Sequence, residues 1–281
     1  MKNPLTTPAR ISQYYNENQF LYNIFWPNNS MHYGYWEHNT KNLKTALINV
    51  DKFILKQLKA TAKDKILDAG CGAGASAIFM AQQTGARVTG ITISDVQVKQ
   101  AREKAARTAV KDLVTFDNQD YQQTNFKDQS FTKIYAIESV CHTPKKIDFL
   151  KEAYRLLKPG GTLVVVDAFQ IDKKFSKKDQ LAYLRFMQGW EVPNLATTKL
   201  FQDSLKKVGF KKIKYYDKFK QIIKNSIILR RLAVIAYPIT FILDKLKLAP
   251  PSIHNNTLAC YYQRDVVKQE LATHGVFVAQ K

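Results

Sequence analysis

The sequence contains few cysteines and no long apolar run. Its three cysteines, Cys71, Cys141 and Cys260, are far apart and odd in number, which supports neither a disulfide framework nor a zinc site. The first ten residues include no apolar signal segment, and no uninterrupted apolar run approaches the ~20 residues of a membrane span. We therefore expect a cytoplasmic protein with reduced cysteines, no metal and no membrane-spanning segment.

Acidic residues are also few. The 281 residues include 43 Lys+Arg and 23 Asp+Glu, a formal net charge of +20. Residues 171–281 have 21 basic and 8 acidic residues, a net of +13, whereas residues 1–170 have 22 and 15, a net of +7. This excess favours anionic partners such as phosphate-bearing substrates or an acidic membrane surface. Aromatic residues gather near the N-terminus rather than among the basic stretches, which argues against nucleic acid.

Glycine is scarce as well, with 11 residues, yet three of them alternate within one short stretch. Residues 65–67 predict a short buried strand, the stretch 68–74 reads Asp-Ala-Gly-Cys-Gly-Ala-Gly, and residues 75–83 have the composition of a helix. Glycine lets the backbone pass close to a ligand, and a helix N-terminus presents free N–H groups. This order of strand, glycine turn and helix therefore predicts a site for a nucleotide-like ligand.

The order of strand and helix repeats along the chain. Further strands are predicted at residues 87–91, 114–118, 131–137 and 163–166, and helices at 95–108 and 145–157. Successive units of this kind predict an α/β fold with a parallel sheet. Beyond residue 168 the pattern loosens, and we predict a helix at 198–208 and strands at 211–216 and 275–279.

Two segments flank or interrupt this core. Residues 1–60 contain an aromatic-rich stretch, a ring-crowded loop at 30–36 and a helical pattern at 43–58, and we expect them to form a helical lid. We assign residues 61–217 and 263–281 to the core. Residues 218–262 form an insertion with an apolar, arginine-containing helix that Pro238 should break or kink. We expect this insertion to roof a pocket for the acceptor, or to lie at an acidic bilayer surface.

The Asp-x-Gly-x-Gly-x-Gly spacing at 68–74 resembles motif I of the class I S-adenosylmethionine (SAM) methyltransferases. The Leu-x-Pro-Gly-Gly turn at 157–161 is a second mark of that class. The resemblance covers residues 60–170 and the 30–36 loop. It implies a Rossmann-like fold with a mostly parallel seven-stranded sheet, helices on both faces, and SAM as cofactor with S-adenosylhomocysteine as product.

Other motifs are similar to those of sterol, tocopherol and rebeccamycin-type small-molecule methyltransferases. These are Gly-Ile-Thr-x-Ser at 90–94, His-Tyr-Gly-Tyr-Trp at 32–36 and Ala-Ile-Glu-Ser-x-x-His-x-Pro at 136–144. Thr92 occupies the place where many class members hold the ribose with an acidic residue, and Gln97 can supply a second polar group. Asp120 and Tyr121 are expected at the adenine, although Asp120 also suits an Asx turn. The residues predicted to bind SAM are Asp68, Gly70, Cys71, Gly72, Gly74, Thr92, Ile93, Gln97, Asp120, Tyr121, Tyr33 and Ile137.

Four residues are candidates for acid–base chemistry. The resemblance to rebeccamycin-type enzymes implies a pair made of His142 and Asp167. Glu138 is an alternative partner for the histidine, or a group that stabilises a carbocation if the acceptor is an alkene. His32 is a second candidate base, in a loop able to fold over the site. Cyclopropane synthases have glutamate where this chain has Cys141, which argues against cyclopropane formation.

The sequence thus predicts SAM-dependent O- or C-methylation of a small acceptor, lipophilic, ring-containing or anionic. Amine N-methylation, which relies mainly on proximity, and a non-catalytic protein that binds SAM or lipid on the same fold stay open as alternatives. The oligomeric state is not indicated.

Overall fold

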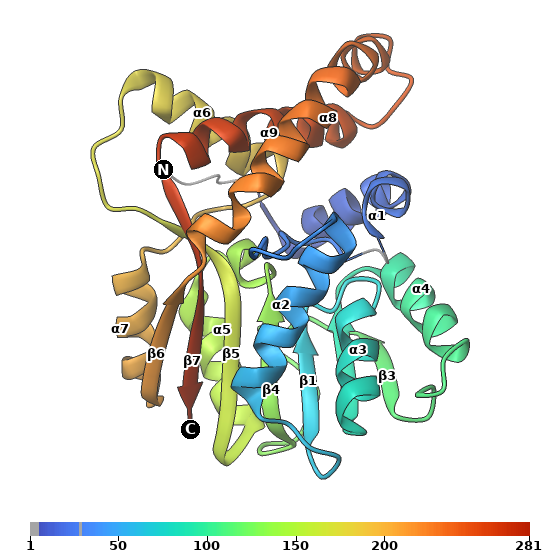
Figure 1. Cartoon of the computed structure of the whole chain (residues 1–281), viewed down its shortest axis with the longest axis vertical. Helices are drawn as coiled ribbons and strands as arrows, with labels where there is room; N and C mark the ends of the chain where they lie inside the picture. The colour runs from blue at the N-terminus through green and yellow to red at the C-terminus, as the bar shows by residue number, and fades with distance from the viewer. Residues whose placement is uncertain (1–5, 28–29) are drawn as a thin grey trace.

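The structure is a computed structural model, and it describes residues 6–27 and 30–281. One seven-stranded sheet runs through the molecule in the order β3-β2-β1-β4-β5-β7-β6 (Figure 1). Strands β1 to β5 pair in parallel, and β7 is antiparallel to both of its neighbours. This confirms the predicted mostly parallel seven-stranded sheet.

The parallel half of the sheet agrees closely with the sequence prediction. Its strands are β1 (Lys65–Ala69), β2 (Arg87–Thr92), β3 (Val114–Asn118), β4 (Phe131–Ile137) and β5 (Leu157–Gln170). The intervening helices are α3 (Ala75–Thr84), α4 (Asp95–Ala106) and α5 (Lys146–Leu156). Ser94 caps α4 as expected, because its hydroxyl accepts the N–H of Gln97 at 3.1 Å.

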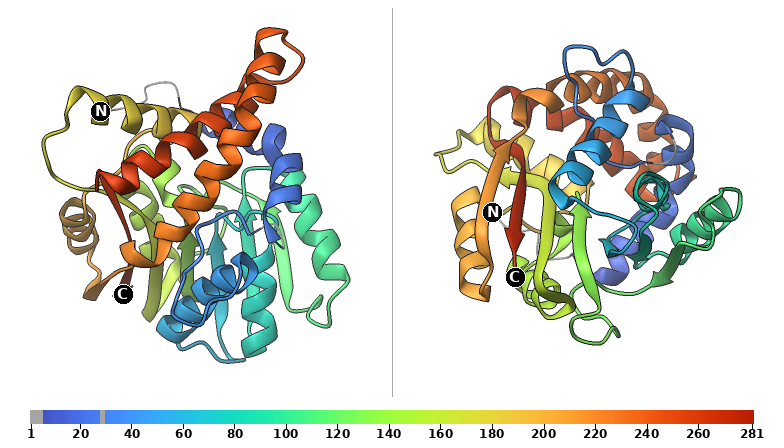
Figure 2. Two further views of the ribbon diagram at one scale, coloured as in Figure 1. Left: turned by 45° about the horizontal axis from the view of Figure 1, so that its top comes forward. Right: turned by 60° about the horizontal axis from the view of Figure 1, so that its bottom comes forward.

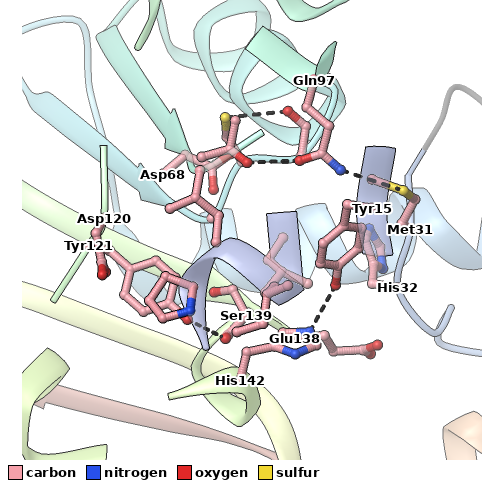
Figure 3. Close-up of a pocket in the computed structure, with 18 of the residues that line it drawn as sticks. Tyr15, Met31, His32, Asp68, Gln97, Asp120, Tyr121, Glu138, Ser139 and His142 are labelled. Carbon is pink, nitrogen blue, oxygen red and sulfur yellow. Dashed lines mark hydrogen bonds between the residues drawn. The ribbon is translucent and has the colours of Figure 1, made fainter. Parts of the chain in front are cut away.

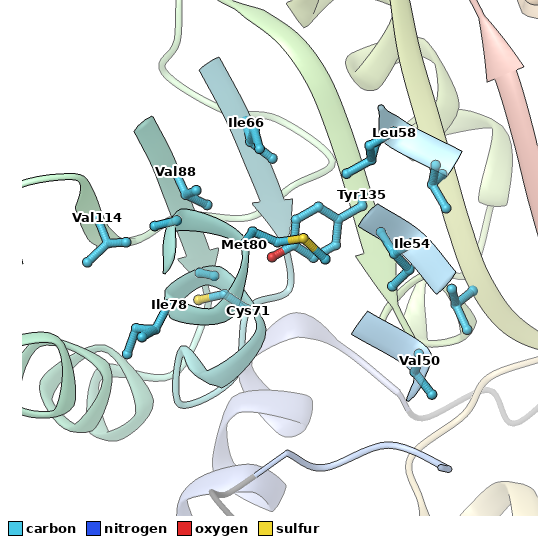
Figure 4. Packing of buried hydrophobic residues seen from close by; sticks show 14 of the residues in the cluster. Val50, Ile54, Leu58, Ile66, Cys71, Ile78, Met80, Val88, Val114 and Tyr135 are labelled. Atoms are coloured by element: carbon cyan, nitrogen blue, oxygen red, sulfur yellow. The ribbon is translucent and has the colours of Figure 1, made fainter. Parts of the chain in front are cut away.

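Helices cover both faces of the sheet. On one face, α2 (Leu43–Leu58) presents Val50, Ile54 and Leu58 to the cluster around Tyr135 that also includes α3 and α4 (Figure 4). On the other face, α5 and α7 (Thr198–Val208) pack in a second cluster. Two buried cores on opposite sides hold the strands rigid, and so fix the edge where their carboxyl ends meet.

The strand β5 differs from the expectation at both ends. It begins at Leu157, so the Pro-Gly-Gly turn belongs to the strand instead of preceding it. There the Gly160 N–H donates to the carbonyl of Lys281 at 3.0 Å. It continues to Gln170, pairing with β7 (Ala272–Gln280). Asp167 therefore lies three residues before the end of the strand, where its side chain is held by backbone groups rather than in a loop.

Four helices form a cover beyond the carboxyl ends of the parallel strands: α1 (Pro8–Phe25), α6 (Lys177–Gly189), α8 (Phe219–Lys245) and α9 (Pro251–Lys268) (Figures 1 and 2). Strand β6 (Lys211–Asp217) leads into α8. Of the predicted lid over residues 1–60, residues 1–5 and 28–29 lie outside the described residues.

Three features of this cover differ from the sequence prediction. Helix α6 was not predicted, although Ser176 and Asp179 form a capping box at its start. Helix α8 continues through Pro238, so of the break or kink expected there the break does not occur. The hairpin of α8 and α9 ends at Lys268, six residues past the predicted boundary. By length and composition α8 could cross a membrane, and only 22% of its most apolar window is buried.

Helices α6 and α9 approach each other at Gly189. A Cβ there would lie 2.2 Å from the carbonyl oxygen of Asn255 and 2.7 Å from the Cβ of Ala259. We therefore expect Gly189→Ala to lower the free energy of unfolding by about 1–3 kcal/mol, despite alanine's higher helix propensity. Denaturant titration measures this change. The control is Gln188→Ala at an exposed position of the same helix, and equal stability of the two variants would contradict the close approach.

Candidate active site

A cavity with about 960 Å³ of empty space, counting its open mouth, lies at the carboxyl ends of β1 to β4. Helix α1 and the 30–32 segment contribute Tyr15, Met31 and His32 to its lining (Figure 3). Of the residues predicted to bind SAM, those that line this cavity are Asp68, Gly70, Cys71, Gly72, Thr92, Ile93, Gln97, Asp120, Tyr121 and Ile137. Residues from four separate segments of the chain, at 68–72, 92–97, 120–121 and 137, therefore meet in one place.

Two glycines of the turn line the cavity without adding a side chain to it. Gly70 and Gly72 have φ angles of +92° and +51°, which disfavour other residues. A Cβ on Gly70 would lie 2.4 Å from the Cβ of Ser139. Gly74 has another function, because it begins α3 and packs against Phe116 instead of lining the cavity.

The N-terminus of α3 faces this cavity without a capping side chain. Its N-cap is Gly74, which offers no side-chain acceptor, and Ala75 and Ser76 of the first turn line the cavity wall. Unpaired N–H groups and the positive end of the helix dipole favour an anionic group there. The carboxylate of SAM's methionine portion fits this end of the cavity.

Two buried acidic residues lie near the same turn. Asp68 accepts the hydroxyl of Tyr135 at 2.8 Å. Burial, reinforced by the neighbouring carboxylate of Asp51, raises the pKa of Asp68 to about 7. One carboxylate oxygen of Asp51 has no hydrogen-bond partner among the described residues. No salt bridge joins Asp68 or Asp51 to a basic side chain in the described part of the chain, and carboxylates of this kind suit the positively charged ammonium group of SAM, so the residues present fit this cofactor.

The polar pair predicted for the ribose is formed. The Thr92 hydroxyl donates to the Oε1 atom of Gln97 at 2.8 Å, and both residues are buried in the cavity wall (Figure 3). Tyr121 is held by donating its hydroxyl to the carbonyl of Ser139 at 2.6 Å. Asp120 accepts the N–H of Gln122, as in the Asx turn left open by the sequence, and still lines the cavity.

A second cavity, with about 740 Å³ of empty space, adjoins the first. The two share five lining residues: Tyr15, Met31, His32, Glu138 and His142. Most other walls are apolar or aromatic and come from α1, α6, α8 and the 190–195 segment; they include Tyr14, Tyr22, Trp26, Phe186, Trp190 and Leu229. Tyr33, predicted at the cofactor, lines this second cavity instead, and so does Asp167.

The hydrogen bonds of His142 define which of its two ring nitrogens bears the proton. Its Nδ1 lies 3.1 Å from the carbonyl oxygen of Glu191, which can only accept, so Nδ1 bears the proton. Its Nε2 then accepts the hydroxyl of Tyr15 at 2.8 Å (Figure 3). Burial lowers the pKa of His142 to about 4, so the ring is neutral at physiological pH. Neither Tyr15 nor Glu191 was predicted as its partner, because both are remote in sequence.

Asp167 does not contact the imidazole of His142 through a hydrogen bond in the described contacts. Its carboxylate accepts the N–H groups of Cys141 and Ala168, each at 2.8 Å. Lys146 donates to the carbonyls of Cys141 and Thr143 at 2.7 and 2.6 Å. Asp167 and Lys146 thus hold the short helix η2 (Val140–His142) that presents His142.

The remaining two candidates border both cavities. Glu138 accepts the backbone N–H of Tyr33 at 2.9 Å and lies 2.9 Å from the Nε2 atom of His274, a partner that the sequence did not reveal. His32 donates through Nδ1 to the carbonyl of Tyr33 at 2.8 Å, so Nε2 is the acceptor nitrogen of the neutral ring. That nitrogen is buried without a partner among the described residues, which leaves it available to a ligand.

A sequence model of the methyltransferase domain family matches residues 67–165. The chain is 35% identical over 161 residues to 27-O-demethylrifamycin SV methyltransferase of Amycolatopsis mediterranei (strain S699), covering 57% of this chain and 59% of that protein. It is 30% identical over 189 residues to O-methyltransferase resE of Aspergillus sclerotiorum, covering 66% of this chain and 70% of that protein. The chain thus spans less than two thirds of the length of the first relative.

Among solved structures, the fold is similar to mycolic acid cyclopropane synthase CmaA1, complexed with SAH and CTAB. The TM-score is 0.85 at 17% identity, covering 99% of this chain and 100% of that chain. At this level of identity the similarity shows the fold alone.

The pKa of Asp68 predicts how cofactor affinity changes with pH. A pKa of about 7 means that Asp68 gains a proton as the pH falls below neutrality, and the neutral form attracts an ammonium group less. We expect SAM affinity, measured by calorimetry, to fall by up to about tenfold per pH unit below this pKa. Asp68→Asn should bind weakly with little pH dependence, and an unchanged profile in that variant would contradict the assignment.

The glycine turn gives a second prediction for the cofactor. Gly72→Val places a branched side chain at a φ of +51°, with its Cβ 3.1 Å from the terminal methyl of Met31 at the cavity wall. We expect calorimetric SAM binding to be lost while circular dichroism stays that of the folded protein. Gly160→Val, also at positive φ but in open space, is the matched control and should still bind.

Proposed function

Because this chain belongs to the SAM-dependent methyltransferase family, we propose that it transfers a methyl group from SAM to a small lipophilic or ring-containing acceptor. The observation that supports this most is the second cavity. It shares a wall with the cofactor cavity, is bounded mainly by aromatic and aliphatic side chains, and presents few polar groups. A cavity of this type favours an apolar body with one or two polar handles.

The chain's own contribution is alignment and exclusion of water. SAM, when bound, supplies an activated methyl group, so an acceptor held in line reacts without further activation of the donor. Helix α1 covers the cofactor cavity through Ile11 and Tyr15, and it is fixed there because Ser12 donates to the carbonyl of Ile93 at 2.8 Å. The same helix walls the acceptor cavity, so one element closes both.

An alcohol or phenol acceptor must also lose a proton. His142 is placed for this step because Nδ1 is already protonated, so Nε2 is the proton acceptor. Its lowered pKa keeps the ring neutral but makes it a weaker base than a histidine that titrates near neutrality. The acceptor hydroxyl either replaces the Tyr15 hydroxyl at Nε2 or passes its proton through that hydroxyl. His32, whose Nε2 is unpaired, is the second candidate base. Asp167 acts as a positioning residue for His142, and Glu138 positions the 32–33 loop.

C-methylation of an alkene is a second candidate, and the aromatic walls favour it. Tyr22, Trp26 and Trp190 surround the cavity, and the faces of such rings stabilise a developing carbocation. In that reaction Glu138, at the junction of the cavities, would balance the positive charge. The acid–base residue would then act after transfer of the methyl group rather than during it.

Substitution of the histidine tests these assignments. For O-methylation we expect His142→Ala to reduce incorporation of labelled methyl from SAM into an extract of the native host by about 10²–10⁴-fold. Calorimetric affinity for S-adenosylhomocysteine should change far less than the activity, because His142 lines the cofactor cavity only where it adjoins the acceptor cavity and the glycine turn is unaltered. His32→Ala is the paired variant, and the larger loss identifies the base.

Two outcomes would contradict the proposal. Activity retained in both histidine variants would favour amine N-methylation, which needs little base catalysis. A wild-type protein that binds S-adenosylhomocysteine but labels nothing in any extract would favour the non-catalytic alternative.

A further inference from the structure

The hairpin of α8 and α9 projects away from the rest of the molecule (Figures 1 and 2). Its distal part, residues 234–250, is called the hairpin tip here. Eight of the fifteen large hydrophobic residues that are exposed in the described structure lie in this short segment: Val234, Ile235, Tyr237, Ile239, Phe241, Ile242, Leu246 and Leu248. Ile235 and Leu248 are 72% and 68% exposed. Exposed apolar residues concentrated in one segment in this way mark a contact site.

Basic residues accompany the apolar ones. Within residues 230–250 the chain has Arg230, Arg231, Lys245 and Lys247, with Asp244 as the sole acidic residue. Arg230 is engaged with Asp265 at 3.1 Å, which leaves three cations at the two ends of the apolar segment. The part of the chain to which the hairpin belongs has a net charge of +13. Apolar residues flanked by lysine and arginine suit the boundary between acyl chains and anionic headgroups.

The proximal half of the hairpin cannot enter a bilayer. Ile222, Asn225 and Leu229 are buried against the core, and the Asn225 side chain donates to the carbonyl of Gly34 at 2.6 Å. The free helical stretch from Val234 to Lys245 rises roughly 18 Å, less than the roughly 30 Å of the hydrocarbon layer. The tip is therefore suited to shallow insertion and not to spanning.

The hairpin also connects this surface to the acceptor cavity. Leu229 of α8 and Asn256 of α9 both line that cavity, and Asn256 lies in the second turn of α9, directly after the tip in the sequence. A membrane at the tip would thus lie on the same side as the cavity that the hairpin roofs.

We propose that the hairpin tip docks on an anionic lipid surface, inserting its exposed aliphatic and aromatic side chains while lysines and arginine contact the headgroups. Delivery of a lipophilic acceptor from that surface rests on the proposed function, whereas the docking itself does not. The interaction is built from apolar burial and charge together, so the loss of either component weakens it.

Sedimentation with vesicles tests the docking without cofactor or acceptor, so its result is independent of methyl transfer. The full chain is mixed with vesicles of phosphatidylcholine alone or with phosphatidylserine added. We expect binding to the anionic vesicles that weakens as salt increases. The double variant Ile235→Glu/Ile242→Glu should bind about tenfold or more weakly, and Lys245→Glu/Lys247→Glu should lose the preference for anionic vesicles.

The matched control is Leu200→Glu, which places the same charge at a 59% exposed leucine on α7, away from the hairpin. It should bind vesicles like the wild type. Calorimetric S-adenosylhomocysteine binding shows that each variant is folded. Absence of wild-type binding to anionic vesicles, or equal binding by the Ile235→Glu/Ile242→Glu variant, would overturn the proposal. So would a concentration-dependent dimer that this variant abolishes, because the tip would then be covered by a second copy.

Discussion

Exclusion of water at the carboxyl edge of the parallel strands is the constraint on which the site depends. The same burial raises the pKa of Asp68 to about 7 and lowers that of His142 to about 4. Asp68 thereby becomes a carboxylate that a bound cation would stabilise, and His142 becomes a neutral base. Helix α1 maintains both states, since it lines the two cavities and contributes Tyr15 to the hydrogen bond with His142.

The parts of the site that are built from neighbouring residues could be predicted from the sequence, because the residues that determine them lie close together in the chain. The order of β1, glycine turn and α3 lies within twenty residues, and the capping of α4 by Ser94 needs only its own first turn. The partners of the candidate bases were not predictable in this way. The Tyr15–His142 and Glu138–His274 contacts join residues 127 and 136 positions apart, so they exist only once the lid and the last strand are in place.

The cover was harder to predict than the sheet for a related reason. A proline inside an apolar stretch normally ends a helix, yet α8 continues through Pro238 in the part of the hairpin that is mostly exposed. Among the described residues, no element covers the apolar side chains of the tip. The spacing of these apolar residues along the helix therefore does not indicate a face that packs against a core. The first half of α8 packs on the core and contributes Leu229 to the acceptor cavity, whereas the second half of the same helix presents an apolar surface.

Selection of a lipophilic acceptor by the apolar cavity beside the cofactor is what defines the proposed function. Its most direct test is transfer of labelled methyl from SAM into an extract of the native host, followed by separation into organic and aqueous phases. We expect label in the organic phase, and less of it when Leu229→Glu places a charge in the cavity wall. Label confined to the aqueous phase would contradict it and indicate a sugar, an amine or nucleic acid as the acceptor.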